Sequence, residues 1–298
     1  MQTNYNSDDP KVGRSMKSED TFVDKMRRKA YLNGKGVNPS EEHQLTLMFP
    51  EIIGQRDDLR HIPNDYARSS IFTVGNRRQA RRTLTHERLF HYNEHISIRY
   101  TGIELRAEDD ELVWLQILKY GQSVPFGQPF EFSIKQLVED CGWHKNGTYY
   151  DRARQCISRL KANEIMVMND KAYGKSGALS MIQSYTTVND SEGQAAYFRV
   201  WIDPNLIVLF AGNTFTNHRW AVYRKLSPLA RRLADYIESH RHPYPLAIET
   251  FRDMCGSRNT NLASLRQKVK KACLEVQTVG IAKTVLLSKQ GQICCSKN

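Results

Sequence analysis

Two regions of this chain place Arg, Lys, Gln and Thr at the spacing of an α-helix, and these side chains are suited to binding nucleic acid. Residues 258–271 contain five basic residues and no acidic residue. Residues 147–163 form a second such region earlier in the chain. Gln and Arg can hydrogen-bond base edges in the major groove of DNA, while Lys and Thr hold phosphates. The residue types therefore indicate two helices that read DNA.

A helical projection separates the side chains of each region into a buried face and a solvent face. In the first helix the expected DNA-contacting residues are Thr148, Arg152, Gln155, Ser158 and Arg159. In the second helix, expected over residues 260–278 with Leu262 on the buried side, they are Thr260, Ser264, Arg266, Gln267, Lys270 and Lys271, with Lys289 added from the following hairpin turn. A solvated lysine-rich face is the competing explanation, and the repetition of the arrangement favours DNA contact.

The two regions belong to an internal repeat. Residues 129–142 and 243–256 have Pro, an aromatic residue, Ile, Cys and Gly at matching positions. Self-similarity of this kind indicates a repeated structural unit. Each copy predicts a helix, a short strand, a second helix, a basic third helix and then β-hairpins, which is the order of a winged helix.

We therefore expect an α+β protein with two tandem winged-helix domains. The first domain is expected over residues 61–212 and the second over residues 213–298, after a polar, disordered tail at residues 1–60. The tail contains ten basic and ten acidic residues, so the net charge of +11 lies in the remainder of the chain. A basic folded part after a neutral tail favours a polyanionic partner.

Composition argues against several other classes of protein. The six cysteines form no C-x-x-C pair, so no metal site and no cofactor is expected, and the pattern suits a reducing cytoplasm. No apolar run is long enough for a membrane span. Gly174-Lys175-Ser176 lacks the preceding glycine of a phosphate-binding loop and is interpreted as a wing turn. His240-Arg241-His242 resembles the two-histidine metal site of a nickase, but the sequence offers no third metal ligand. No catalytic centre is therefore expected.

The tail contains one apolar peptide, Gln44-Leu45-Thr46-Leu47-Met48-Phe49. A short apolar cluster in a polar tail either docks back on the protein or binds a partner. For partner binding, Leu47 and Phe49 are expected to fill an apolar pocket, with Gln44 at its edge.

The chain resembles the TrfA type of plasmid replication initiators over roughly residues 40–298. The matching strings are Pro63-Asn64-Asp65, Ala67-Arg68-Ser69, Tyr100-Thr101-Gly102, Glu104-Leu105-Arg106, residues 109–114, Asn146-Gly147, Tyr149-Tyr150, residues 208–212, Tyr223-Arg224-Lys225-Leu226-Ser227-Pro228, Ala230-Arg231-Arg232, Ser239-His240-Arg241 and Pro243-Tyr244-Pro245-Leu246. Residues 1–39 show no match to the family pattern.

The resemblance implies a plasmid-associated bacterial protein of the cytoplasm that has no catalytic activity. It implies binding to direct repeats (iterons) at a plasmid origin, opening of adjacent AT-rich DNA with contact to the single strand, and recruitment of host DnaA, the DnaB helicase and the sliding clamp. The clamp would bind the peptide at residues 44–49, which has one more residue than the family's form. It further implies copy-number control through a homodimer in equilibrium with an active monomer. A winged-helix transcriptional repressor without a replication role is the alternative, and a rolling-circle nickase is the third reading.

Overall fold

The structure is a computed structural model that describes residues 57–75, 79–124, 127–169, 177–203, 206, 209 and 215–297. The expected disordered tail and the apolar peptide Gln44–Phe49 lie outside these residues, apart from the last residues of the tail. Within the described residues, no helix combines the length and apolar character needed to cross a membrane.

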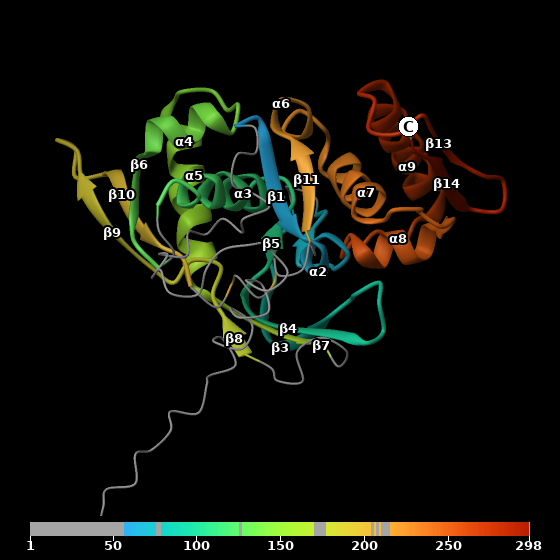
Figure 1. Ribbon diagram of the computed structural model, residues 1–298, viewed down its shortest axis with the longest axis horizontal. Helices are drawn as coiled ribbons and strands as arrows, with labels where there is room; N and C mark the ends of the chain where they lie inside the picture. Colours follow the sequence, from blue (N-terminus) through green and yellow to red (C-terminus); the bar gives the residue numbers. More distant parts are fainter. Residues whose placement is uncertain are drawn as a thin grey trace, which may run out of the picture.

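The expected repeat is present as a repeated order of mixed α and β elements (Figure 1). The first copy comprises α3 (Asp110–Gly121), β6 (Phe130–Ser133), α4 (Ile134–Asp140), α5 (Gly147–Lys161), β9 (Ser184–Asn189) and β10 (Ala195–Trp201). The second comprises α7 (Pro228–Ser239), β12 (Leu246–Ala247), α8 (Ile248–Met254), α9 (Leu262–Thr278), β13 (Thr284–Leu287) and β14 (Gln292–Ser296). In both copies the short strand pairs with the last hairpin strand, giving sheets β6-β10-β9 and β12-β14-β13.

Side-chain caps fix where the repeated helices begin. The Ser133 hydroxyl accepts a hydrogen bond from the Gln136 backbone amide at 3.0 Å. Ser227 caps α7, with Pro228 at the first helical position. Asn146 and Asn261 cap α5 and α9 through their side-chain oxygens. Both third helices thus start with the same capping chemistry.

The start of α9 corrects two expectations. Because Asn261 is the cap, Thr260 precedes the helix instead of lying within it. Leu262, expected on the buried face, is 43% exposed. The first helical turn extends beyond the core, which begins at Leu265. The later core residues of this helix, Val269, Cys273 and Val276, are buried as predicted.

The hairpins that follow α5 divide between two sheets, whereas the sequence predicts that they are the wings of one winged helix. Strands β7 (Asn163–Asn169) and β8 (Gly177–Leu179) join β3 (Thr83–Leu89) and β4 (Ile96–Ile103) in the order β3-β4-β7-β8. The register places Ile165 opposite Tyr100 and Val167 opposite Ile98 on the buried face. The Gly174-Lys175-Ser176 stretch, outside the described residues, therefore connects two strands of this separate sheet.

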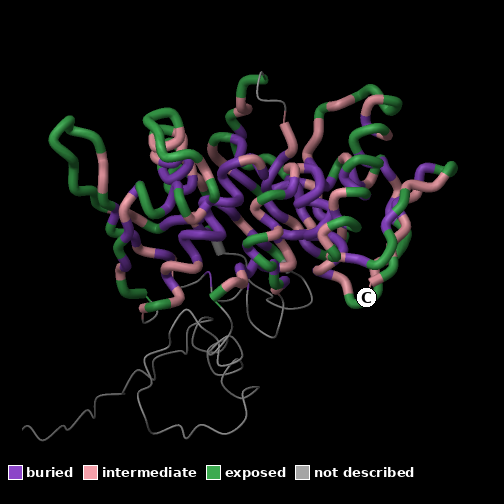
Figure 2. Tube along the Cα trace, turned by 90° about the horizontal axis from the view of Figure 1, so that it is seen from above, coloured by how far each residue is buried: buried purple, intermediate pink, exposed green. Residues whose placement is uncertain are grey.

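Strand pairs also join the beginning of the chain to the second copy. Strand β1 (Leu59–Pro63) pairs antiparallel with β11 (Phe215–Arg219), which precedes α6 (Trp220–Tyr223). The expected tail therefore ends before Leu59, since Leu59 and Arg60 belong to β1. Short strands β2 (Phe72–Thr73) and β5 (Leu105–Arg106) pair in parallel near α2 (Asn64–Ala67). Buried residues form one continuous band through both copies (Figure 2).

The centre of this band contains a charged side chain with no solvent exposure, Arg232 of α7. Its guanidinium contacts Asp235 at 2.5 Å and Glu111 of α3 at 3.2 Å. It also donates to the carbonyls of Ala67 and Ser69 at 2.9 and 2.6 Å. A buried charge is tolerated only when it is paired and hydrogen-bonded. Arg232 meets that condition by joining α7 to α3 and to the end of α2.

His218 of β11 extends the cluster. Its ring lies 2.8 Å from Asp235 and also contacts the Glu238 carboxylate. Burial acts to lower the pKa of His218. The negative charge of Glu238 and the hydrogen bond between His218 and Asp235 outweigh burial and raise this pKa to about 10. On β1, burial lowers the pKa of His61 to about 4, despite its hydrogen bond to Asn217.

The raised pKa of His218 predicts that stability falls as pH rises above about 6.5. Between about 6.5 and about 10, His218 holds its proton in the folded protein but loses it in the unfolded chain. The stabilisation is complete below pH 6.5 and is lost as pH approaches 10. We expect urea denaturation to show a decrease on the order of 2 kcal/mol between pH 6.5 and 9.5. His218→Gln should reduce this slope without abolishing it, because burial also raises the pKa of Glu111 in the same cluster to about 8. His61→Gln should retain the slope; equal slopes in all three proteins would contradict the assignment.

Candidate nucleic-acid interface

Three of the five residues of α5 that were expected to contact DNA are exposed to solvent. Thr148, Gln155 and Ser158 are exposed, opposite the buried stripe Ala153, Cys156, Ile157 and Leu160. Arg152 is half-buried at the margin: its guanidinium lies 3.2 Å from Asp109 and 5.1 Å from the centre of the Trp143 ring. Gln155 is therefore the side chain of α5 best placed to reach a base edge.

Arg159 does not suit the role of a DNA contact. Its side chain is 12% exposed and its Nε donates to the buried Asp110 carboxylate at 2.9 Å. The same carboxylate accepts from Arg81 at 2.6 Å. Projection alone placed Arg159 beside the solvent face, but it could not show that α3 brings two acids against it. The side chain anchors α5 to the beginning of α3.

The expected residues of α9 are more accessible. Gln267, Lys270 and Lys271 are exposed, and Gln267 lies directly opposite the buried stripe of this helix. Ser264 and Arg266 are half-buried, with the Arg266 guanidinium packed against Gly291 of the β13–β14 turn. Thr260 is exposed just before the helix, and Lys289 is exposed in the turn.

Two adjoining grooves connect the faces of α5 and α9. A groove of about 290 Å³ is lined by Arg152, Gln155 and Arg159 from α5 together with Arg81 and Arg106. A larger groove of about 830 Å³ is lined by α9 and by the beginning of α7. Glu108 lines both grooves, so the groove beside α5 and the groove beside α9 adjoin at this residue.

The larger groove adds two cationic residues to those selected from the sequence, Arg258 and Lys268. Both are exposed. The run of basic residues over 258–271 already contained them, so the sequence carried the signal for both. By contrast, Arg81 in the smaller groove could be found only through the arginine run that precedes β3.

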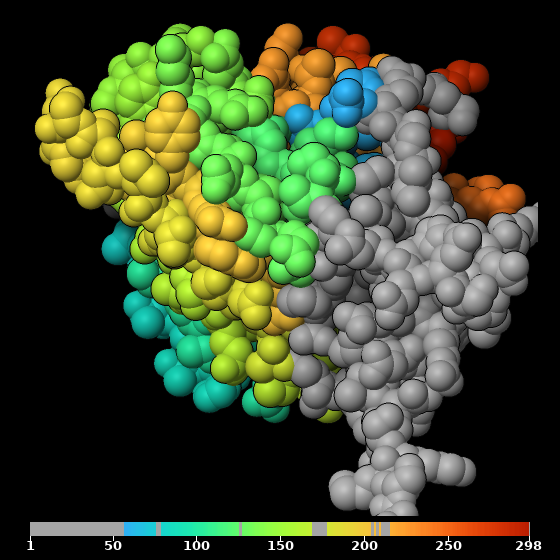
Figure 3. Space-filling model, turned by 60° about the vertical axis from the view of Figure 1, so that its left-hand side comes forward, coloured from blue at the N-terminus to red at the C-terminus, as the bar shows by residue number. Residues whose placement is uncertain are grey.

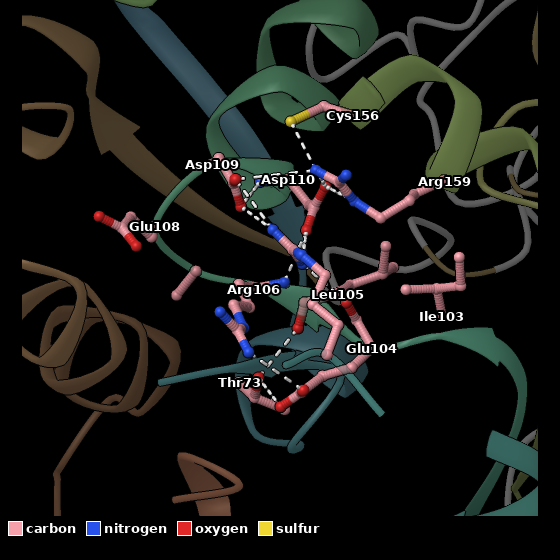
Figure 4. A network of polar contacts seen from close by, with 12 residues as sticks. Thr73, Ile103, Glu104, Leu105, Arg106, Glu108, Asp109, Asp110, Cys156 and Arg159 are labelled. Carbon is pink, nitrogen blue, oxygen red and sulfur yellow. Dashed lines mark hydrogen bonds and ion pairs between the residues drawn. The ribbon is translucent and has the colours of Figure 1, made fainter. Parts of the chain in front are cut away.

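A dense ion-pair cluster forms the floor of the smaller groove (Figure 4). Arg81 contacts Asp109 at 2.8 Å and Asp110 at 2.6 Å. Burial acts to raise the pKa of Asp109, but the charge of Arg81 outweighs it and the pKa is lowered. Arg106 donates from its backbone amide to Asp110 at 2.8 Å. The guanidinium groups therefore act as fixed counterions of these two carboxylates.

Asp109, Asp110 and Cys156 lie close enough together to be considered as metal ligands. The donor set does not suit a cation, because Arg81 and Arg159 already occupy the carboxylate oxygens. Burial, reinforced by the two aspartates, raises the pKa of the Cys156 thiol well above its ordinary value, which disfavours the thiolate needed for coordination.

His240, considered as part of a nickase site, has a structural role instead. Its Nδ1 lies 2.7 Å from the Tyr236 carbonyl, and its ring packs against Tyr236 and Tyr92. Burial lowers its pKa despite the hydrogen bond. The neighbouring His242 is exposed and shares no cluster of ligand atoms within the described residues.

The β9–β10 hairpin projects from the body beside α4 and α5 (Figure 3). Val188 and Tyr197 are direct cross-strand partners and are 66% and 59% exposed. Arg199 lies on the same strand with its guanidinium over Trp201 at 5.5 Å. The hairpin thus presents an exposed apolar pair and a cation next to the third helix.

The different environments of Gln155 and Arg159 predict different mutant behaviour. Arg159→Met should reduce the free energy of unfolding by about 1–3 kcal/mol, because it removes a partner from the buried Asp110 carboxylate. Gln155→Ala should change stability by less than about 0.5 kcal/mol and should weaken binding to a preferred DNA site. Urea denaturation and fluorescence anisotropy would measure the two effects. A fully stable Arg159→Met that loses DNA sequence preference would refute the structural role.

The comparisons with known proteins agree with this architecture. A solved structure of domains 2 and 3 of RctB is similar in fold, with a TM-score of 0.52 at 12% sequence identity; the match covers 78% of this chain and 96% of that chain. An Escherichia coli protein described as plasmid replication initiator protein TrfA is 43% identical over 241 residues, 81% of this chain. The match spans 62% of that relative's length.

A family model described as TrfA protein matches residues 23–296, which is most of the chain. This match confirms the resemblance drawn from the sequence strings. The chain belongs to the TrfA family.

Proposed function

We propose that this protein initiates plasmid DNA replication by binding direct repeats at a plasmid origin with α5 and α9. The observation that carries the proposal is that these two helices occupy the same place in a repeated unit and open onto adjoining grooves with exposed basic and amide side chains. Membership of the TrfA family supports the role in initiation.

Each copy is interpreted as a winged-helix domain, over residues 61–212 and 213–298. In this interpretation α5 and α9 are recognition helices, and the β9–β10 and β13–β14 hairpins are wings. A recognition helix enters the major groove, and a wing contacts the backbone beside it. The sheet β3-β4-β7-β8 is then an addition to the first domain, outside the recognition unit.

The side chains divide into two expected roles. Gln155 and Gln267 can read base edges, since an amide bonds adenine with two hydrogen bonds. Thr148, Ser158, Thr260, Ser264, Lys270, Lys271 and Lys289, together with Arg258 and Lys268, are suited to phosphates. Arg152 and Arg266 are held by neighbouring groups and would serve both the protein and the DNA backbone.

The partners follow from the family resemblance. We propose origin opening with contact to AT-rich single-stranded DNA, and recruitment of host DnaA and the DnaB helicase. Gln44, Leu47 and Phe49 would bind the sliding clamp, and a homodimer in equilibrium with the active monomer would control copy number. No catalytic step is proposed. The name of the Escherichia coli relative favours initiation over the alternative of a transcriptional repressor.

Footprinting on DNA that flanks the encoding gene tests this function. Two helices from one chain should protect two segments separated by about 34 Å on one side of the duplex. With on the order of eight phosphate contacts, a plot of log affinity against log salt concentration should have a slope near −7. A slope shallower than about −2, or protection without sequence preference, would argue against the proposal.

A matched pair of substitutions on α9 separates base reading from phosphate contact. Gln267→Ala should weaken binding to the preferred site by about 1–3 kcal/mol and affect random DNA much less. Lys271→Ala should weaken both about equally and make the salt slope shallower by about one. The roles are wrongly assigned if both variants behave alike on both DNAs in anisotropy titrations.

A further inference from the structure

A chain of polar contacts links the two helices assigned to DNA reading, α5 and α9. At the α5 end, Arg159 contacts Asp110 and Arg152 contacts Asp109. Arg81 joins both aspartates and also donates to the Glu104 carbonyl at 2.7 Å. Figure 4 shows this chain descending from Arg159 through Asp110 to Glu104.

Glu104 is the point where the chain of contacts reaches the second copy. Its carboxylate is 1% exposed and lies 3.6 Å from Arg258, which follows α8 and precedes α9. The Arg258 guanidinium also donates to the Ala80 carbonyl at 3.3 Å. The same carboxylate accepts from the Thr73 hydroxyl at 2.7 Å and from the Arg82 amide at 3.1 Å.

Backbone contacts hold the α8–α9 turn against the same surface. The Val74 amide donates to the Cys255 carbonyl at 2.7 Å. Gly256 has φ of +54°, and a Cβ there would lie 2.7 Å from the Thr73 side chain. This close approach prevents the α8–α9 turn from moving toward β2. The Glu104–Arg258 ion pair holds the turn on its other attachment to this surface.

We propose that Glu104 is a positioning residue that fixes α9 relative to α5 and thereby sets the spacing of the two DNA segments the protein accepts. The inference rests on the proposed function, in which both helices contact one duplex. Inserting one base pair between the segments moves them apart by about 3.4 Å and rotates one by about 35°. A protein that holds α9 rigidly relative to α5 cannot accommodate that change, whereas a protein in which α9 can move is able to do so.

Electrostatics and positioning predict different results for Glu104→Gln. The substitution removes a negative charge near a basic groove, so charge alone would strengthen binding to every DNA and leave spacing preference unchanged. A positioning role predicts relaxed spacing preference. Glu87→Gln is the matched control, because it removes the same charge from an exposed carboxylate that pairs with the Arg82 side chain.

The experiment uses the full chain and a preferred duplex selected from a random-sequence pool with the wild type. Affinities are measured for that duplex and for versions with one or two base pairs inserted between the protected segments. The wild type should bind the preferred duplex more tightly than the duplexes with inserted base pairs. Glu104→Gln should reduce this ratio of affinities by about tenfold or more, and Glu87→Gln should preserve it. Arg258→Gln, at a residue with 36% side-chain exposure, should also reduce the ratio, and it carries the test if Glu104→Gln does not fold.

The outcomes distinguish the two levels of the proposal. Protection of a single segment by the wild type would overturn the proposed function, and this inference with it. Two protected segments, with wild-type spacing dependence retained by the folded Glu104 and Arg258 variants, would overturn the inference alone.

Discussion

The fold depends on a guanidinium group buried without solvent contact between the two copies of the repeat. Burying a charge costs several kcal/mol unless partners replace its water. Arg232 obtains these partners from α7 itself, from Glu111 on α3 and from the carbonyls of Ala67 and Ser69. Its environment is complete only when both copies and the segment after β1 are in place. The two copies therefore depend on each other for stability, although the sequence repeats as if each were independent.

This dependence affects how the interface works. Arg231, the neighbour of Arg232, donates to the Leu226 carbonyl and to the Ala107 carbonyl just before α3. The beginning of α7 and the beginning of α3 are thus held together directly beneath the grooves. Asp109 and Asp110 then transmit that placement to α5 through their arginine contacts. The buried ion pairs therefore position the elements that line the grooves, which form the surface proposed to bind DNA.

Local chemistry predicted the repeated elements well, and long-range packing explains what it missed. The Ser133 and Ser227 caps and the buried stripe of α5 were readable because they depend on neighbours within a few residues. Arg159 was misassigned because its partner Asp110 lies on another helix, and a charge at a helix margin looks solvated until the tertiary contact is known. The sheet that β7 and β8 join was missed for a related reason: a hairpin pattern fixes two strands but not the sheet they join.

The two helices proposed to read DNA, α5 and α9, differ in the partners of their charged side chains. On α5 the arginines at the margins are neutralised by Asp109, Asp110 and Asp151, so little free positive charge faces solvent. On α9 the exposed lysines have no acidic partner within the described part of the chain, and their charge is available to phosphates. In the proposed function, counterion release comes mainly from the second copy, while the first contributes shape and amide contacts. Binding of one duplex by both helices then requires that α5 and α9 be held at a fixed separation.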